Sequence, residues 1–370
     1  MATPIIKNSL LTVILLLCTL TNVIAAKEPT MRFNNEIIVR TVTNLKTTAD
    51  VDRLVSLCHQ YRIATITIAF KQDEDDEIPS GYVFYPSNIA PVATGYATFD
   101  ILHYLITAAH AKQINVKAWI PQFHDQVAYK KHNSWRMMVY REGKVTPFAQ
   151  NSSEYFVNPL HPDVQHYELS IIKEILTRYN IDGIVLDWIR FNDYNMDLSD
   201  TTRKHYKKMF GYDPITIDFT TENSKRIQWN HYRMDGIASY IARVKKSIHA
   251  IKPTVTLDAF VLSPAWKELA QDPRRFASSI DMISPMCYYD DWKYPVEWIY
   301  GKRSDAILPL IRRKVPNKEI IPIFDTNWDR TVYQKIFANL HNIHTIGWFH
   351  YGKWTSREIG RINDYTTLEK

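Results

Sequence analysis

The chain has 370 residues, and its 45 lysines and arginines against 39 aspartates and glutamates give a formal net charge of +6. The basic residues are scattered among the acidic ones rather than gathered in blocks, which excludes the charge footprint of a nucleic-acid-binding protein. Three cysteines are too few for a disulfide framework, whereas 10 tryptophans and 22 tyrosines favour aromatic rings that stack on sugars as well as rings in a core.

The N-terminal segment has the pattern of an export signal. Lys7 supplies a positive flank, residues 10–20 are a short apolar run, and residues 23–25 form a small-residue cleavage site. Because this run is much shorter than the roughly 20 residues that span a bilayer, cleavage is favoured over a lone transmembrane anchor. We therefore predict a signal peptide at 1–26, an exported protein that is periplasmic or secreted, and no stable membrane insertion after cleavage.

Short β-branched runs then alternate with longer amphipathic segments, which is the pattern of parallel strands joined by helices. The strands are expected, in order, at residues 37–42, 64–70, 116–120, 183–187, 254–260, 282–288, 320–324 and 344–349. The helices are expected at 50–61, with Asp50 as the N-cap, and at 99–112, 162–179 and 266–278, with a helical insertion at 199–252 after the fourth strand.

Eight strand and helix pairs in order predict an α/β fold of the closed (β/α)8 type, a TIM barrel. The sequence has no linker-like or low-complexity stretch, so we expect one domain at 33–356, followed by a C-terminal tail at 357–370. An open doubly wound sheet is the alternative, but no glycine-rich phosphate-binding loop supports it.

Aspartates at predicted strand ends are the candidate catalytic residues, because reacting groups in such a barrel stand at the carboxyl ends of the strands. Asp187 ends an apolar strand, Asp258 lies in the fifth strand, and Asp290 follows the sixth. Hydrolysis of a glycosidic bond needs two carboxyl groups, one protonated to assist the leaving oxygen and one ionised to attack or to activate water. The alternatives are that Asp187 caps the next helix and that Asp258 points into the barrel.

Residues near these aspartates are candidates for substrate binding. Arg190 and Arg40 are expected to lower the pKa of Asp187, which makes it the nucleophile or base and Asp290 the acid, although the roles can be reversed. Asp291 and Asp325 are expected to be solvated loop or helix-cap residues. The predicted substrate-binding residues are Arg40, Trp119, His124, Trp188, Arg190, Tyr288, Trp292 and Trp354, and each aromatic ring has core packing as its alternative.

No catalytic metal and no cofactor are expected. The pairs His161 with His166 and His341 with His344 lack the i, i+4 spacing and the intervening glutamate of a zinc-binding His-Glu-x-x-His helix. The Gly-x-Ser-x-Gly pattern of serine hydrolases is also absent from the sequence.

Three blocks of the sequence carry a family resemblance. Residues 156–164 (FVNPLHPDV), 182–191 (DGIVLDWIRF) and 281–291 (DMISPMCYYDD) resemble blocks of a glycoside-hydrolase-like (β/α)8 barrel family of exported bacterial proteins, and the resemblance extends over about residues 36–354. It implies a (β/α)8 fold and O-glycosyl hydrolysis, with the aspartates at the fourth and sixth strand ends, Asp187 and Asp290, as catalytic carboxylates.

The same strand-four block is more distantly similar to family 18 chitinases. Ile189 occupies the position of their catalytic glutamate, and Val185 that of an earlier aspartate. These departures argue against the chitinase mechanism, in which an acetamido group of the substrate is the nucleophile, but not against an amino-sugar polymer as ligand.

The sequence thus predicts an exported glycoside hydrolase that cleaves a polysaccharide, amino-sugar polymers included. The expected partner is a polysaccharide or oligosaccharide substrate, with no nucleic acid. The main alternative is a non-catalytic glycan-binding barrel of the cell envelope, and a purely structural envelope protein is a third reading of the same chain.

Overall fold

The structure is a computed structural model, and it describes residues 33–151, 154–352 and 362. The predicted signal peptide, the C-terminal tail apart from Ile362, and Trp354 lie outside the described residues. Within these ranges, no helix combines the length and the apolar character needed to cross a membrane.

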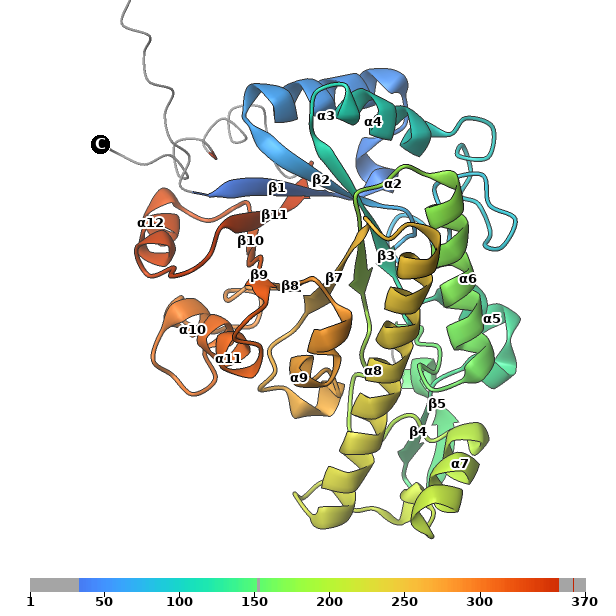
Figure 1. The fold of residues 1–370 in the computed structure, drawn as a ribbon. Coiled ribbons are helices and arrows are strands. Elements are labelled where there is room, and N and C mark those ends of the chain that lie inside the picture. The colour runs from blue at the N-terminus through green and yellow to red at the C-terminus, as the bar shows by residue number, and fades with distance from the viewer. Residues whose placement is uncertain (1–32, 152–153, 353–361, 363–370) are drawn as a thin grey trace, which may run out of the picture.

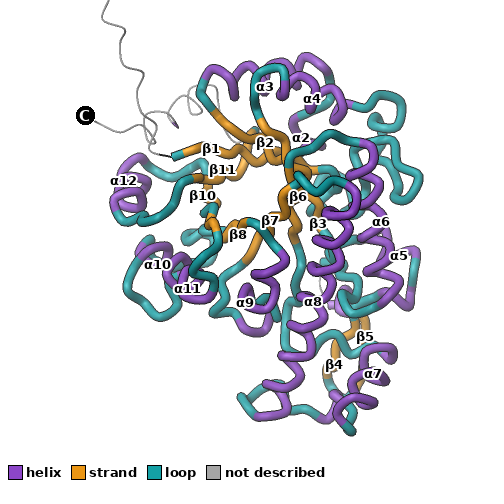
Figure 2. The backbone as a smooth tube through the Cα atoms, in the orientation of Figure 1, coloured by secondary structure: helices purple, strands orange, loops and turns teal. Residues whose placement is uncertain are grey.

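Nine parallel strands form one curled sheet at the centre of the molecule (Figures 1 and 2). Its order is β10-β11-β1-β2-β3-β6-β7-β8-β9, so strands that follow one another in the chain are neighbours in the sheet. This order excludes the doubly wound alternative, in which the strand order reverses at a switch point. The strands are β1 (Asn34–Val39), β2 (Ile63–Ala69), β3 (Asn115–Pro121), β6 (Gly183–Asp187), β7 (Thr256–Val261), β8 (Met282–Pro285), β9 (Glu319–Ile320), β10 (Ile323–Asp325) and β11 (Thr345–Tyr351).

The strand predicted at 320–324 is broken into two. β9 pairs with β8, and β10 pairs with β11, while Ile321 and Pro322 lie between them. Pro322 has no amide hydrogen to donate to a neighbouring strand, although its carbonyl oxygen accepts a hydrogen bond from the Gly347 amide at 3.0 Å. Because of this break, the chain pairs with β8 before Ile321 and with β11 after Pro322.

Helices cover the outside of the curled sheet (Figure 2). They are α2 (Thr41–Asn44), α3 (Thr48–Gln60), α4 (Ile101–His110), α5 (Gln126–Lys131), α6 (Pro162–Arg178), α7 (Asp200–Phe210), α8 (Ser224–Ile251), α9 (Pro273–Phe276), α10 (Glu297–Tyr300), α11 (Ile307–Lys314) and α12 (Arg330–Ala338). The N-cap of α3 is Thr47 rather than Asp50, because the two form a capping box in which each side chain accepts a hydrogen bond from the other's backbone amide. The helix expected at 266–278 is only the short α9 flanked by two 3-10 turns.

A small satellite lobe extends from the main body, at the bottom of Figure 1. It consists of the antiparallel hairpin β4 (Met138–Arg141) and β5 (Lys144–Pro147), α7, and the first part of α8. Its core is a separate cluster in which Leu198, Tyr206, Ile217 and Trp229 are buried. The second part of α8 lies beside α6 on the main body, so one 28-residue helix joins the two cores.

Candidate active site

Asp187 is the last residue of β6, whose five residues are all buried. Its side chain is held by two N–H donors: the Trp119 indole Nε1 donates to Oδ2 at 3.1 Å, and the Trp188 amide donates to Oδ1 at 2.7 Å. Trp119 is only 2% exposed. Trp119 therefore holds the Asp187 side chain in position. Its ring is buried and not open for stacking on a sugar, so Trp119 has the core-packing role that was the alternative prediction.

Burial raises the pKa of Asp187 to about 6. The Trp188 amide and the Arg190 charge lower the pKa, but they do not offset burial, and the negative charge of Glu74 raises it further. The expectation that arginines hold this pKa below its ordinary value is therefore wrong. A carboxyl group with a pKa of about 6 exchanges its proton near neutral pH, as a general acid or base must.

Trp188, the residue after Asp187, contacts two other predicted substrate-binding residues, His124 and Arg190. The imidazole of His124 stacks on the indole, with ring centroids 4.4 Å apart and planes 20° apart, and the Arg190 guanidinium lies 4.3 Å from the indole centroid. Trp188 has φ of 53°, a left-handed conformation that bulky residues rarely adopt. The chain thus turns sharply at the residue after Asp187, which brings the three side chains together.

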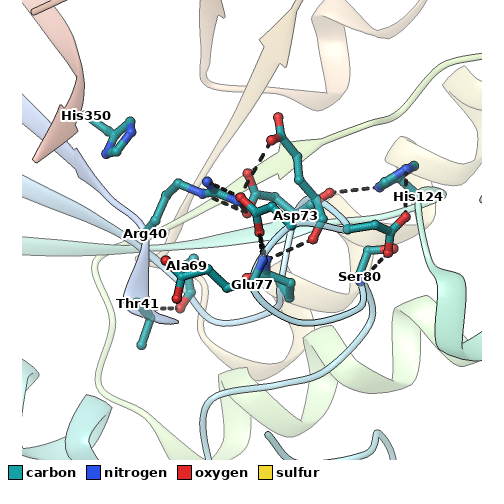
Figure 3. Close-up of polar contacts among 12 residues, drawn as sticks. Arg40, Thr41, Ala69, Asp73, Glu77, Ser80, His124 and His350 are labelled. Atoms are coloured by element: carbon teal, nitrogen blue, oxygen red, sulfur yellow. Dashed lines mark hydrogen bonds and ion pairs between the residues drawn. The ribbon is translucent and has the colours of Figure 1, made fainter. Parts of the chain in front are cut away.

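An acidic loop after β2 contacts two of the predicted substrate-binding residues, Arg40 and His124 (Figure 3). The loop contains a run of five consecutive acidic residues at 73–77, which was the available sequence signal. Arg40, which follows β1, binds this loop through Asp73 at 3.0 Å and Asp76 at 2.6 Å. Burial raises the pKa of Asp73 to about 7 despite the Arg40 charge. Arg40 thus fixes the loop.

The same loop orients His124. Nδ1 of His124 donates a hydrogen bond to the carbonyl oxygen of Asp73 at 2.8 Å, and its Nε2 lies 3.6 Å from Asp75 Oδ2. Both Nε2 and Asp75 Oδ2 are buried without a hydrogen-bond partner in the described part of the chain. Burial lowers the pKa of His124, so its imidazole is neutral at pH 7.

Tyr288 brings a further carboxyl group into the site. Burial raises the pKa of Tyr288, and the charges of Asp187 and Asp325 raise it further. Phe349 connects these residues, because it is the register partner of Asp325 and its ring centroid lies 5.6 Å from that of Tyr288 and 6.2 Å from that of Trp119, which binds Asp187. Asp325 ends β10, is 8% exposed and accepts a hydrogen bond from the Asn327 amide at 2.9 Å. The expectation that Asp325 is a solvated loop or helix-cap residue is therefore wrong, since it ends a strand, is buried, and the N-cap of the following helix is Asp329. The predicted Trp292 is half-buried, with its ring centroid 5.7 Å from that of Tyr288.

Asp290 and Asp258 lie in quite different surroundings. Asp290 is exposed, and its Oδ1 accepts a hydrogen bond from the Trp328 indole at 3.0 Å. Asp258 is the third residue of β7 rather than the last, is fully buried, and pairs with Lys117 at 3.5 Å and with the Ser284 hydroxyl at 2.8 Å. Asp258 therefore points into the interior, which was the alternative prediction, and Lys117 compensates its buried charge there.

No group of three or more His, Cys, Asp and Glu side chains within the described ranges is arranged to hold a metal ion.

A parallel α/β sheet with carboxyl groups and aromatic rings at its strand ends is the arrangement found in glycoside hydrolases. Residues 38–307 match the family model described as "Putative glycosyl hydrolase domain", and the chain belongs to this family. A curated relative is the glycosyl hydrolase DigH of Escherichia coli (strain K12), 25% identical over 278 residues, which are 69% of this chain and 56% of DigH. The chain spans about half the length of the curated relatives it matches.

Solved structures show the same fold. The PgaB (BpsB) glycoside hydrolase domain from Bordetella bronchiseptica superposes with a TM-score of 0.70 at 13% identity, over 91% of this chain and 100% of that one. A β-galactosidase from Marinomonas ef1 gives a TM-score of 0.63 at 11% identity, over 90% of this chain and 59% of that one. The family and these glycosyl hydrolase relatives support a glycosidase.

Proposed function

We propose that this chain is an exported glycoside hydrolase that cleaves O-glycosidic bonds of a polysaccharide, with Asp187 as a catalytic carboxyl group. The observation that supports this most is the state of Asp187, which is buried at a strand end without an ion pair to any described residue and has its pKa raised to about 6. The chain belongs to a family of glycosyl hydrolase domains, and hydrolysis of a glycosidic bond needs a carboxyl group of this kind.

The fold supports a finer proposal, that the curled sheet is a (β/α)8 barrel with a helical insertion after its fourth strand. Only two residues separate β9 from β10, and together the two strands occupy one place between β8 and β11. Counting them as one broken strand gives eight. The segment with α7 and the first part of α8 then corresponds to the insertion.

We propose Asp325 as the second carboxyl group, ahead of Asp290. Asp187 and Asp325 are both buried strand-end residues, and both raise the pKa of the same Tyr288 hydroxyl. Asp290, which the family resemblance had suggested, is exposed and bonded to Trp328. It stays the rival candidate, and the experiment below includes it.

In the proposed reaction Asp187 transfers its proton to the glycosidic oxygen as the bond from that oxygen to the anomeric carbon breaks. Asp325 either forms the new bond to that carbon, after which water activated by the deprotonated Asp187 displaces it and releases the sugar, or takes a proton from the water that attacks the carbon directly; the spacing of the two groups decides which. Ile189 and Val185 are both buried apolar residues, which supports this pair over a chitinase-like mechanism.

The experiment is reducing-end release from poly-N-acetylglucosamine, its partly deacetylated form, peptidoglycan glycan and galactosaminogalactan. Wild type is compared with Asp187→Asn, Asp325→Asn and Asp290→Asn, and with Asp200→Asn as a matched control, because the Asp200 side chain is 80% exposed. Cleavage of one polymer that is lost in Asp187→Asn and Asp325→Asn but kept in Asp290→Asn and the control supports the proposal. Loss in Asp290→Asn with an active Asp325→Asn replaces Asp325 by Asp290.

The second candidate function is glycan binding without cleavage. The observation in its favour is that the aspartate expected to act with Asp187 is bonded elsewhere, to Trp328. Wild type that binds one of these polymers and releases no reducing ends from any of them overturns the hydrolase and leaves the binding protein.

Export to the periplasm or the medium is proposed on the sequence pattern at 1–26. Expression of the full chain, followed by fractionation and N-terminal sequencing, tests it. A mature chain that begins near residue 27 outside the cytoplasm is the expected result, and an uncleaved chain in the cytoplasm overturns it.

A further inference from the structure

A cavity of about 280 Å³ lies between the loops that follow β6 and β7 and the first part of α8. Tyr194 lines it from the loop after β6, Trp266 from the loop after β7, and Arg226 from α8. The two loops follow the carboxyl ends of neighbouring strands, and the Phe191 amide donates to the Leu269 carbonyl oxygen at 2.9 Å to join them. The cavity therefore opens at the same end of the sheet as Asp187.

Positive charge predominates in the lining of this cavity. Four cations, Arg226, Lys267, Arg274 and Lys314, line it with two carboxylates, Glu222 and Asp272. Glu222 is exposed and lies 3.6 Å from Lys267 and 3.9 Å from Arg226. Asp272 is buried and binds Arg274 at 2.8 Å and Lys314 at 3.2 Å, and these contacts lower its pKa in spite of burial. Asp272 thus acts as an anchor that holds two of the cations in place, and the cation excess favours a negatively charged ligand.

An aromatic path connects this cavity to the active site. The ring of Trp266 packs edge-on against Trp292, with centroids 4.9 Å apart, and Trp292 lies 5.7 Å from Tyr288. Tyr288 packs against Phe349 at 5.6 Å, and Phe349 lies 6.2 Å from Trp119, whose indole donates a hydrogen bond to Asp187. Aromatic faces stack on the apolar faces of sugar rings, and the half-buried Tyr288, Trp292 and Trp266 form a row of rings that leads from the active site to the cavity.

We propose that this cavity is a subsite for a carboxylate-bearing sugar unit of the polysaccharide, with Trp266 stacking on the ring and Lys267 and Arg274 pairing with the carboxylate. Pockets for drug-sized ligands measure roughly 300–1,000 Å³, so a cavity just below that range suits one sugar unit. The subsite rests on the proposed glycosidase, since it places a charged unit of the substrate a short way along the chain from the cleaved bond.

The test measures binding rather than cleavage. The full chain with Asp187→Asn is titrated calorimetrically with hexagalacturonate and with a peptide-free tetrasaccharide of alternating N-acetylglucosamine and N-acetylmuramic acid, each before and after reduction of its carboxyl groups. We expect at least one acidic glycan to bind about 10-fold more tightly than its carboxyl-reduced form, because a charge-assisted hydrogen bond is lost on reduction. This preference should weaken as sodium chloride is raised.

The variant Lys267→Gln with Arg274→Gln removes two cations whose side chains are each 63% exposed, and Lys314 still pairs with Asp272, so we expect it to fold, which its circular dichroism checks. It should abolish the preference for the acidic glycan, while the matched control Lys173→Gln with Lys335→Gln, exposed and distant in sequence, keeps it. Equal affinity for acidic and reduced glycans, binding of neither acidic glycan, or an unchanged preference in the double variant overturns the subsite.

The failures of the two proposals are distinguishable. If wild type cleaves a neutral polymer and shows no preference for carboxylates, the subsite is wrong and the glycosidase stands. If wild type cleaves nothing and the double variant still removes a preference for an acidic glycan, the subsite stands as a binding site and the glycosidase is wrong.

Discussion

Asp187 at the strand ends and Asp258 in the interior of the sheet are both buried, but their surroundings balance charge differently. Asp258 shares Lys117 with Glu36, at 3.5 Å and 2.6 Å, and receives a hydrogen bond from Ser284. Asp187 forms no ion pair with a described residue and receives only N–H donors. A buried carboxylate that pairs with a lysine is compensated within the interior. A buried carboxylate without a cation lowers the free energy of unfolding, and a catalytic role explains why such a residue is retained.

A second cluster of buried charged side chains has the same arrangement as the one around Asp258. Lys71 is completely buried between Glu168, at 2.7 Å, and Asp125, at 2.9 Å. The lysine supplies the compensating charge, as Lys117 does, and neither cluster leaves a carboxyl group without a cation.

Asp197, before α7, is also buried without an ion pair to a described residue, but the Ser199 and Thr202 hydroxyls and the Met138 amide donate hydrogen bonds to it. Asp187 differs from all of these carboxyl groups in that it lies at a strand end and accepts hydrogen bonds from only two N–H groups.

The largest effect is expected on the activity of Asp187→Asn. If Asp187 donates the proton, cleavage of the natural glycan falls by about 10²–10⁴-fold, the usual contribution of a general acid. The 2,4-dinitrophenyl glycoside of the same sugar needs no proton on its leaving oxygen, so it keeps most of its rate. Steady-state rates on both substrates check this, and an equal loss on both assigns Asp187 the role of nucleophile or base.

Removal of the shared lysine should have the largest effect on stability. Lys117→Met leaves Glu36 and Asp258 without their cation, and we expect a loss of about 3–5 kcal/mol in the free energy of unfolding at pH 7. Urea denaturation of wild type, Lys117→Met and the exposed control Lys335→Met measures it. A loss below about 1 kcal/mol would mean that the interior charges are solvated, and the contrast with Asp187 would disappear.

Asp187→Asn should change stability in the opposite direction. The folded pKa of about 6 lies above the unfolded value, so the native state binds more protons and the free energy of unfolding falls as pH rises from about 4 to 6. Replacement by asparagine removes this penalty, and we expect a gain of roughly 1–3 kcal/mol at pH 7.5 that shrinks at pH 5. Denaturation at both pH values checks the sign, and a destabilised Asn variant at pH 7.5 refutes it.

The sequence predicted those features that depend on neighbouring residues and missed those that depend on distant ones. Asp187 was recognisable because it ends an apolar run, and the strand order followed from the alternation of segments. The inward direction of Asp258 depends on Lys117, 141 residues earlier in the chain, and the burial of Asp325 depends on the strand break at Pro322. The acidic run at 73–77 was visible, but its role depends on Arg40, which no local pattern connects to it.

The smallest effect is expected where an ion pair is more open to water. Arg203 and Asp213 in the satellite lobe pair at 2.7 Å, and both side chains are 25% exposed. Asp213→Asn keeps the shape and can still cap the following turn, so we expect a loss of no more than about 1 kcal/mol in the free energy of unfolding, reduced further by salt. Urea denaturation at low and high salt measures it. A loss as large as that of Lys117→Met would show that geometry, and not burial, sets the strength of the ion pairs in this protein.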